Sequence, residues 1–156
     1  MRKLKIYLDT SVISHLDHQD APDKMRTTLS LWDAIKAGKY DVFISSITKR
    51  ELEDCKEPKR SILFGYLQQI TYGIVPLNEQ TLIIADKMVE LDILTSKSID
   101  DCQHIAAAIA SGCDIIVSWN LKHFVNDKII QGVRAITSIT GFPKILIYTP
   151  SILIRR

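Results

Sequence analysis

The chain has 156 residues, of which 46% are apolar and 24% are charged, and its formal net charge is +2. This length suits one domain with its own hydrophobic core, which we expect to span residues 1–156. The near-neutral charge excludes the strongly basic surface of many nucleic-acid-binding domains, so any phosphate contact must come from a local patch.

Short apolar runs alternate along the chain with segments whose apolar residues recur at helical spacing. The runs predict strands at residues 5–8, 41–45, 114–118 and 144–148, and a strand or extended link at 74–77. The periodic segments predict helices at residues 11–18, 23–36, from 47 onward, 58–70, 79–91, 98–111 and 131–139. This alternation predicts an α/β fold with a mainly parallel sheet covered by helices on both faces.

Turn residues support several of these boundaries. Pro22 suits the start of the 23–36 helix, and Gly38 and Gly112 suit the ends of two helices. Trp32 lies on the apolar face of the 23–36 helix, so we expect it in the core.

Polar side chains follow three of the predicted strands. Asp9 comes directly after the first strand, Glu51 lies in the first turn of the helix after the second, and Asn120 follows the 114–118 strand. Asp101 lies at the start of the helix that leads into that strand. Because open α/β sheets bind ligands beyond the carboxyl ends of their strands, we expect these four side chains to meet in one site.

Two neighbouring acids open the 98–111 helix, and helical spacing distinguishes them. Asp101 shares a face with Ile105, Ala108 and Ile109, which we expect to pack on the sheet. Asp100 is turned away from that face by roughly 100°. We therefore choose Asp101 as the inward carboxylate.

Helix capping is the competing explanation for each of these residues. Thr48-x-x-Glu51 and Ser98-x-x-Asp101 both match the capping box, and Asn120 is a suitable N-cap for a segment that begins at Leu121. Taken one at a time, these residues are better explained as helix starts. Capping residues should be spread over both edges of a sheet, however, whereas these map to one edge, which favours a shared site.

Carboxylates brought close together repel one another unless a cation or a proton intervenes. An oxygen-rich site without thiolates suits Mg²⁺ or Mn²⁺ better than Zn²⁺. Such sites serve phosphoryl chemistry, in which a metal activates water and stabilises the leaving oxygen, so we expect phosphodiester hydrolysis.

Four stretches carry a resemblance to a known family: Tyr7 to Ser11, Ser46 to Leu52, Asp101 to Ala108, and Asp114 to Asn120. In their order and spacing they resemble the PIN domain, in particular the VapC-like toxins of prokaryotic type II toxin–antitoxin pairs. The resemblance extends over nearly the whole chain and includes Ile147 to Pro150.

The resemblance implies a three-layer α/β/α sandwich and a ribonuclease that depends on Mg²⁺ or Mn²⁺. Asp9, Glu51 and Asp101 match the three main acidic positions of the family, and Asn120 falls where many members have a fourth Asp. An amide ligand brings no negative charge, so a second metal should bind more weakly. The resemblance also implies a homodimer, an RNA substrate and a cognate antitoxin that lies in a groove near the site.

Other polar residues near these positions have two explanations each. Thr10 and Ser11 either hydrogen-bond a metal-bound water or cap the first helix. His123 either contacts phosphate or is a solvated loop residue, and His104 is better explained as a structural histidine than as a ligand. A basic group around Glu51 either steers RNA or pairs locally with acids on a solvated helix face. Its members are Lys49, Arg50, Lys56, Lys59 and Arg60.

Two features bear on the cellular compartment. The apolar run after the basic start of the chain ends at Asp9 and is too short for a signal peptide or a membrane span. Cys55, Cys102 and Cys113 have no C-x-x-C spacing, so we expect reduced, mostly buried thiols rather than a zinc site. We expect a cytoplasmic protein without membrane contact.

Three apolar segments suit either partner surfaces or packing within the domain: the 23–36 helix, the 79–91 helix and the tail from Ile152. Their number exceeds what one core needs, which is compatible with the expected homodimer and antitoxin.

Other functional classes remain as alternatives. A haloacid-dehalogenase-like phosphatase needs a second acid two positions after the first, where this chain has Ser11, and a receiver domain needs a Lys near its last strand, which here leads to Thr149 and Pro150. The stronger alternatives are a non-catalytic PIN-like module that binds RNA or protein, which Asn120 makes conceivable, and a housekeeping RNA-processing nuclease.

Overall fold

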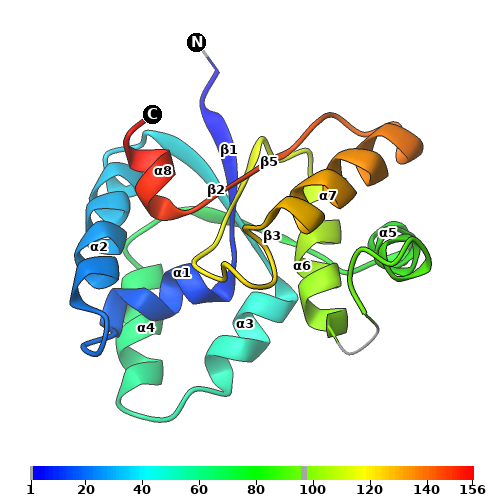
Figure 1. Cartoon of the computed structure of the whole chain (residues 1–156). Helices are drawn as coiled ribbons and strands as arrows, with labels where there is room; N and C mark the ends of the chain where they lie inside the picture. The colour runs from blue at the N-terminus through cyan, green and yellow to red at the C-terminus, as the bar shows by residue number, and fades with distance from the viewer. Residues whose placement is uncertain (1, 96–97) are drawn as a thin grey trace.

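The computed structural model describes residues 2–95 and 98–156. A parallel sheet lies at its centre (Figure 1). Five strands lie in the order β3-β2-β1-β4-β5, and every neighbouring pair is parallel. Their bounds are β1 (Leu4–Leu8), β2 (Tyr40–Ser45), β3 (Tyr72–Val75), β4 (Ile115–Val117) and β5 (Leu146–Tyr148). The predicted parallel sheet is therefore confirmed, with β1 as its central strand.

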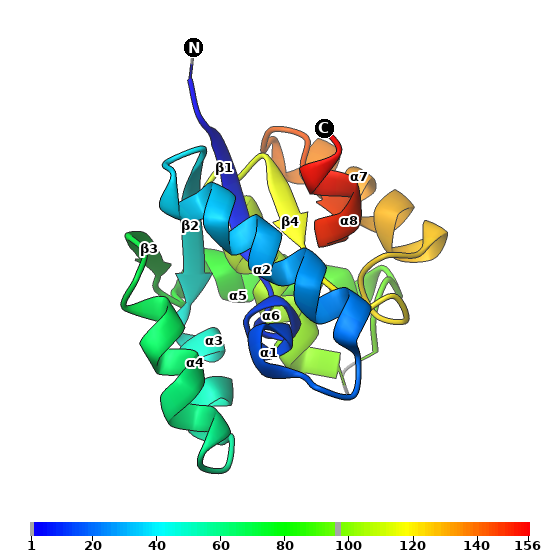
Figure 2. The same cartoon turned by 90° about the vertical axis from the view of Figure 1, so that its left-hand side faces the viewer.

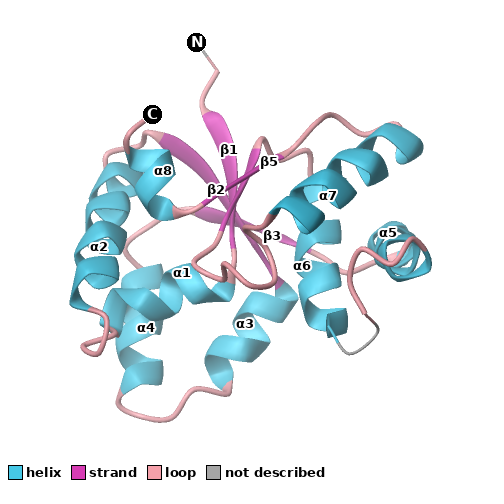
Figure 3. Ribbon diagram, in the orientation of Figure 1, coloured by secondary structure: helices cyan, strands magenta, loops and turns pink. Residues whose placement is uncertain are grey.

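Helices cover both faces of this sheet, which makes three layers (Figures 1 and 3). Those on one side are α1 (Thr10–Ser14), the 3₁₀ turn η1 (His15–Asp17), α2 (Pro22–Lys36), α4 (Lys59–Leu67) and α8 (Pro150–Ile154). Those on the other side are α5 (Glu79–Glu90), α6 (Ile99–Ala110) and α7 (Asp127–Thr140). α3 (Ser46–Glu53) follows β2 at the carboxyl edge of the sheet, and Figure 2 shows α2 crossing in front of the strands.

Alternate residues of the strands feed two separate cores. In β1, Ile6 and Leu8 pack with α1, α2 and α4, whereas Tyr7 packs with α5, α6 and α7. Trp32 is buried in the first core, as predicted, and its indole N–H donates to the Tyr66 carbonyl oxygen at 3.2 Å. This alternation follows from strand geometry, because successive side chains point to opposite faces of a sheet.

Several boundaries differ from the sequence prediction, and three of the differences have a clear local cause. α7 begins at Asp127 rather than at residue 131 because the Asn126 side chain accepts the Ile129 amide at 3.0 Å and caps the helix. The tail from Pro150 forms α8, which the prediction lacked, and the Thr149 hydroxyl caps it. β3 begins at Tyr72, two residues early, since that residue pairs in register with Val42.

The predicted helix ends at Gly38 and Gly112 are confirmed, because both glycines adopt the left-handed conformation, with φ of 83° and 72°. The cysteines are unpaired, and burial raises the pKa of Cys102 and of Cys113 to about 11, so these two thiols remain protonated at neutral pH.

The apolar segments that suited either partner surfaces or packing within the domain differ in how much of their apolar surface is buried. α2 packs its apolar face inside the domain, with Leu31, Trp32 and Ile35 buried. α5 leaves Leu82 and Ile83 exposed. No helix within residues 2–95 and 98–156 combines the length and the apolar character needed to cross a bilayer.

Gly132 in α7 permits a close approach to Ile93, and this contact predicts the effect of adding a methyl group. A Cβ at Gly132 would lie 2.5 Å from Ile93 Cγ2 and 2.7 Å from Cγ1. Although alanine is favoured in helices by roughly 1 kcal/mol over glycine, the clash with a buried branched side chain costs more, at about 1–3 kcal/mol. Because these two effects oppose each other, we expect Gly132→Ala to lower the free energy of unfolding by up to about 2 kcal/mol in urea titrations.

Gly65 in α4 provides the matched control, since nothing lies within 4 Å of the added Cβ. There we expect Gly65→Ala to raise the free energy of unfolding by about 0.5–1 kcal/mol. A Gly132→Ala variant as stable as Gly65→Ala would show that Ile93 yields without cost.

Candidate functional site

The candidate site lies where the chain connections diverge. From β1 the chain proceeds to β2 on one side of the sheet, whereas from β4 it proceeds to β5 on the other. The crevice beyond the carboxyl ends of β1 and β4 is therefore a topological switch point, the usual ligand position in open α/β sheets. Asp9 follows β1 there, and Ser118 follows β4.

Asp9 is buried, with 5% of its surface exposed, and two hydroxyl groups hold its carboxylate. The Ser11 and Ser118 hydroxyls donate to Asp9 Oδ2 at 2.7 and 2.9 Å. Each hydroxyl oxygen also accepts a backbone amide, Ser11 from Trp119 at 3.0 Å and Ser118 from Asn120 at 2.9 Å. These contacts tie the segments after β1 and β4 together around one charge.

Glu51 reaches the same region from α3. Its Oε1 accepts the Thr10 hydroxyl at 2.8 Å and lies 2.6 Å from His104 Nε2. Burial raises the pKa of Glu51, but the hydrogen bonds from His104 and Thr10 outweigh burial and leave the pKa below its usual value. Thr10 and Ser11, expected to bind water or cap a helix, thus both donate to carboxylates of the site.

His104 links two of the carboxylates. It is 1% exposed, and its Nε2 lies 2.6 Å from Glu51 Oε1 and 3.7 Å from Asp9 Oδ1. Its Nδ1 lies 2.6 Å from the Tyr7 hydroxyl, which in turn contacts Ser45 Oγ at 2.8 Å. Both ring nitrogens therefore face an oxygen atom.

The charges around His104 favour its protonated form. Burial lowers the pKa of His104, but the hydrogen bond to Glu51 and the charges of Asp9, Glu51 and Asp101 outweigh burial and raise the pKa above its usual value. The sequence favoured a structural histidine, which is confirmed because both ring nitrogens of the buried side chain have partners, but it did not place His104 among the carboxylates. Its position three residues after Asp101, one helical turn along the same face of α6, was the available signal.

Asp101 is the more buried of the two neighbouring acids. Its side chain is 20% exposed, against 47% for Asp100, which pairs with Arg50 at 2.9 Å. Asp101 Oδ2 lies 2.6 Å from His123 Nδ1. Burial raises the pKa of Asp101, His123 opposes this effect, and the charge of Asp9 adds to it, so Asp101 belongs to the same electrostatic cluster.

Asn120 lies beside this cluster in the turn after β4. Its backbone amide donates to the Ser118 hydroxyl at 2.9 Å, and its side-chain oxygen accepts the His123 amide at 3.0 Å. The side chain therefore stabilises the turn in the manner expected of a capping residue.

Neither of the two predicted capping boxes forms. α3 begins at Ser46, and the Thr48 hydroxyl accepts the Ser45 amide at 3.3 Å, so Glu51 lies in the second turn, beyond the reach of the cap. Ser98 occupies the N-cap position of α6 without a side-chain capping bond. The carboxylates of Glu51 and Asp101 point instead to His104 and His123.

The basic group around Glu51 is partly neutralised by neighbouring acids. Arg50 pairs with Asp100, and Arg60 pairs with Glu57 at 3.5 Å. Lys49 forms no ion pair with any described residue. Local pairing, one of the two expected explanations, therefore holds for Arg50 and Arg60.

The oxygen atoms of the site suit a hard divalent ion, because three carboxylates and an amide are ligands that Mg²⁺ and Mn²⁺ prefer. In the structure these side chains hydrogen-bond to other protein groups and do not surround one ion position. Among residues 2–95 and 98–156, no three His, Cys, Asp or Glu side chains converge closely enough to hold an ion as they stand. His104 lies between Glu51 and Asp9, and His123 holds Asp101. The donor chemistry thus fits a cation that would compete with these histidines.

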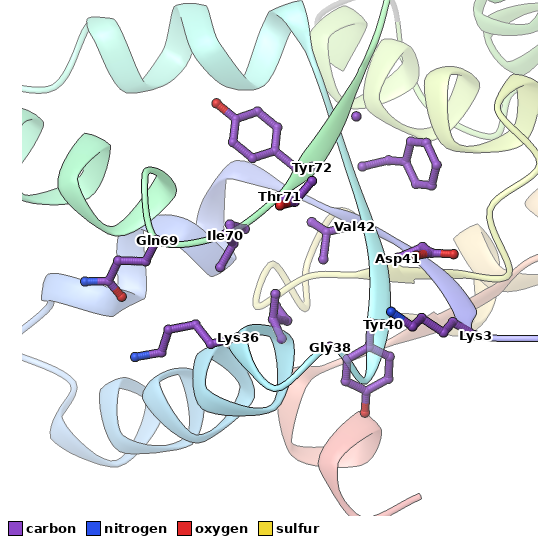
Figure 4. Close-up of a pocket in the computed structure, with 13 residues that line it drawn as sticks. Lys3, Lys36, Gly38, Tyr40, Asp41, Val42, Gln69, Ile70, Thr71 and Tyr72 are labelled. Carbon is purple, nitrogen blue, oxygen red and sulfur yellow. The ribbon is translucent and has the colours of Figure 1, made fainter.

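A cavity of about 510 Å³ at the opposite edge of the sheet is separate from this site (Figure 4). It is lined by Gly38, Tyr40 and Tyr72, which lie at or before the amino ends of β2 and β3. The carboxylates lie beyond the carboxyl ends of the strands, so this cavity does not contribute to their chemistry.

Comparison with known proteins identifies the fold. No protein-family model and no curated protein matches the sequence. Among solved structures, the chain is similar to one in the crystal structure of VapBC2 from Rickettsia felis bound to a DNA fragment from their promoter. The two are 17% identical with a TM-score of 0.58, and the match covers 94% of this chain and 98% of that one. At this identity the similarity shows the fold alone, and it confirms the expected PIN-like, three-layer architecture.

The Tyr7 hydroxyl predicts a stability effect within the site. Tyr7→Phe would leave the Ser45 hydroxyl and His104 Nδ1, both buried, without this partner. We expect the free energy of unfolding to fall by about 1–3 kcal/mol in urea titrations, because unsatisfied buried polar groups carry that cost. Tyr40→Phe is the matched control, since the Tyr40 hydroxyl makes no hydrogen bond within the described residues, and a loss as large as that of Tyr7→Phe would contradict the assignment.

Proposed function

We propose that the chain is an endoribonuclease that requires Mg²⁺ or Mn²⁺, hydrolyses RNA phosphodiester bonds and acts as the toxin of a type II toxin–antitoxin pair. The observation that supports this proposal best is the gathering of Asp9, Glu51 and Asp101 around His104 at the switch point of the sheet. The fold shared with VapBC2 supports it independently.

In such a reaction some residues of the chain would hold the cation and others would orient these ligands. Asp9, Glu51 and Asp101 would hold the cation, with Asn120 as an additional oxygen ligand. When bound, a divalent ion supplies Lewis-acid catalysis, activating water and stabilising charge on the leaving oxygen. Ser11 and Ser118 fix the direction of the Asp9 carboxylate, while Thr10 and His104 do so for Glu51 and His123 for Asp101. Such supporting contacts determine how well ligands are preorganised.

The partners follow from the same proposal. One neighbour of known structure is a VapBC complex, which supports a cognate antitoxin for this chain, and RNA is the proposed substrate. We also propose a homodimer, for which the exposed side chains of Leu82 and Ile83 on α5 provide apolar surface.

Loss of a ligand carboxylate is the direct test. We expect Asp9→Asn and Asp101→Asn each to reduce cleavage of mixed RNA in Mg²⁺ or Mn²⁺ by more than the roughly 10–100-fold typical of losing a supporting partner. Both variants should have the same urea midpoint of unfolding as the wild-type protein, because an amide keeps the size and one acceptor oxygen of the acid. Electrophoresis of labelled RNA measures the rate.

Asp100→Asn is the matched control, because Asp100 precedes Asp101 on α6 but points to Arg50. This variant should cleave RNA at the wild-type rate. Full activity in both Asp9→Asn and Asp101→Asn would refute the nuclease site.

Growth arrest on induced expression, relieved by co-expression of an antitoxin encoded beside it, would separate a toxin from a housekeeping nuclease.

Asn120→Asp tests whether this position contributes to metal binding. A fourth carboxylate adds negative charge beside Asp9 and Asp101, so we expect tighter Mn²⁺ binding in a calorimetric titration. The carboxylate can still accept the His123 amide, which should preserve the turn. An unchanged Mn²⁺ affinity would place Asn120 outside the ligand shell and favour the alternative of a binding module without catalysis.

A further inference from the structure

A cavity of about 450 Å³ opens next to the carboxylates, on the side of α7. His123 belongs to both places, because its Nδ1 contacts Asp101 at 2.6 Å and its side chain lines the cavity. The volume lies within the roughly 300–1,000 Å³ of ordinary small-molecule sites. A ligand in this cavity would therefore be adjacent to the reaction centre proposed above.

The walls of the cavity combine apolar and cationic character. Ile93 and Ile129 are buried and line it, and Leu121 is 52% exposed although it lies in a turn directly beside the site. Lys122 and Lys128 also line the cavity, and neither forms an ion pair with a described residue.

The charged side chains among the described residues that line the cavity are the two lysines. No described acidic residue lines the cavity, and the nearby Asp101 is engaged by His123. Apolar surface beside unpaired lysines suits a ligand with a flat ring face and an attached anion, and a nucleotide has both.

The turn that carries Leu121 is held in place by its own hydrogen bonds. The Asn120 carbonyl oxygen accepts the amides of Phe124 and Val125 at 3.0 and 3.3 Å, and the Asn126 side chain donates to the Lys122 carbonyl oxygen at 2.6 Å. Phe124 is fully buried and anchors the turn. Opposite it, the absence of a side chain at Gly132 lets Ile93 approach α7 and form one wall. The cavity is thus largely preformed, which favours binding.

We propose that this cavity binds one base of single-stranded RNA, next to the phosphate that is hydrolysed at the carboxylate site, with Lys122 and Lys128 contacting the flanking phosphates. This inference rests on the proposed function and names a substrate subsite for it. Leu121 supplies contact area to the base and His123 connects the subsite to the reaction centre.

The test measures RNA binding without cleavage, in an Asp9→Asn background. Fluorescence anisotropy compares a labelled six-nucleotide RNA of mixed sequence with the same RNA made abasic at one position at a time. We expect Leu121→Ser to weaken binding of the intact RNA about tenfold, because it removes part of the apolar contact area with the base. It should leave unchanged the binding of the RNA that lacks the base that occupies the cavity.

Two comparisons isolate the subsite. Leu77→Ser, in the link after β3, is the matched control, because Leu77 is 36% exposed and lies outside this cavity, and it should alter neither affinity. Lys122→Ala and Lys128→Ala should weaken intact and abasic RNA alike and each reduce the salt dependence by about one phosphate contact.

The outcomes separate this inference from the proposed function. If Leu121→Ser weakens every RNA equally, or behaves like Leu77→Ser, or if no RNA binds, the base subsite is refuted, and a protein segment becomes the better occupant. If the base-selective loss occurs but the wild-type protein cleaves no RNA with Mg²⁺ or Mn²⁺, the subsite stands and the nuclease proposal falls.

Discussion

The burial of one carboxylate at the end of the central strand is the constraint on which the site depends. An isolated charge in the position of Asp9 would cost far more than a domain of this size tolerates. Ser11, Ser118 and His104 compensate that cost, and they come from three separate segments. Because each partner must arrive at the right place, the loops after β1 and β4 and the start of α6 are fixed relative to one another.

The packing of α6 makes this arrangement possible. Ala106, Ala107 and Ala108 are fully buried, and their small side chains let the helix lie against the sheet. The first turns of α6 then bring Asp101 and His104 to the carboxyl edge, where their charges act on Asp9 and on each other. The acids raise the pKa of His104, and the positive charge that this side chain carries when protonated would offset the repulsion between them, as a bound cation would. The charges of these acids hold the histidine among them.

The local patterns of the chain were informative about the fold. Five short apolar runs became the five strands, and the glycines after α2 and α6 ended those helices. The errors arose where a cap or a strand partner outweighed the apolar pattern: Asn126 starts α7 four residues early, Thr149 starts α8, and pairing with β2 extends β3 to Tyr72. The helical face also identified Asp101 as more buried than Asp100.

The sequence by itself therefore determined the succession of strands and helices and the placement of acids near strand ends, because both depend on neighbours within a few residues. Only the tertiary structure decided the partners of those acids. The Asp9–Ser118 contact joins residues 109 positions apart, and the Glu51–His104 contact joins residues 53 positions apart. Periodicity places a side chain on a face, but the meeting of two faces depends on how the whole sheet is ordered and covered. For this reason the sequence indicated that His104 is a structural histidine but did not reveal that it lies among the carboxylates.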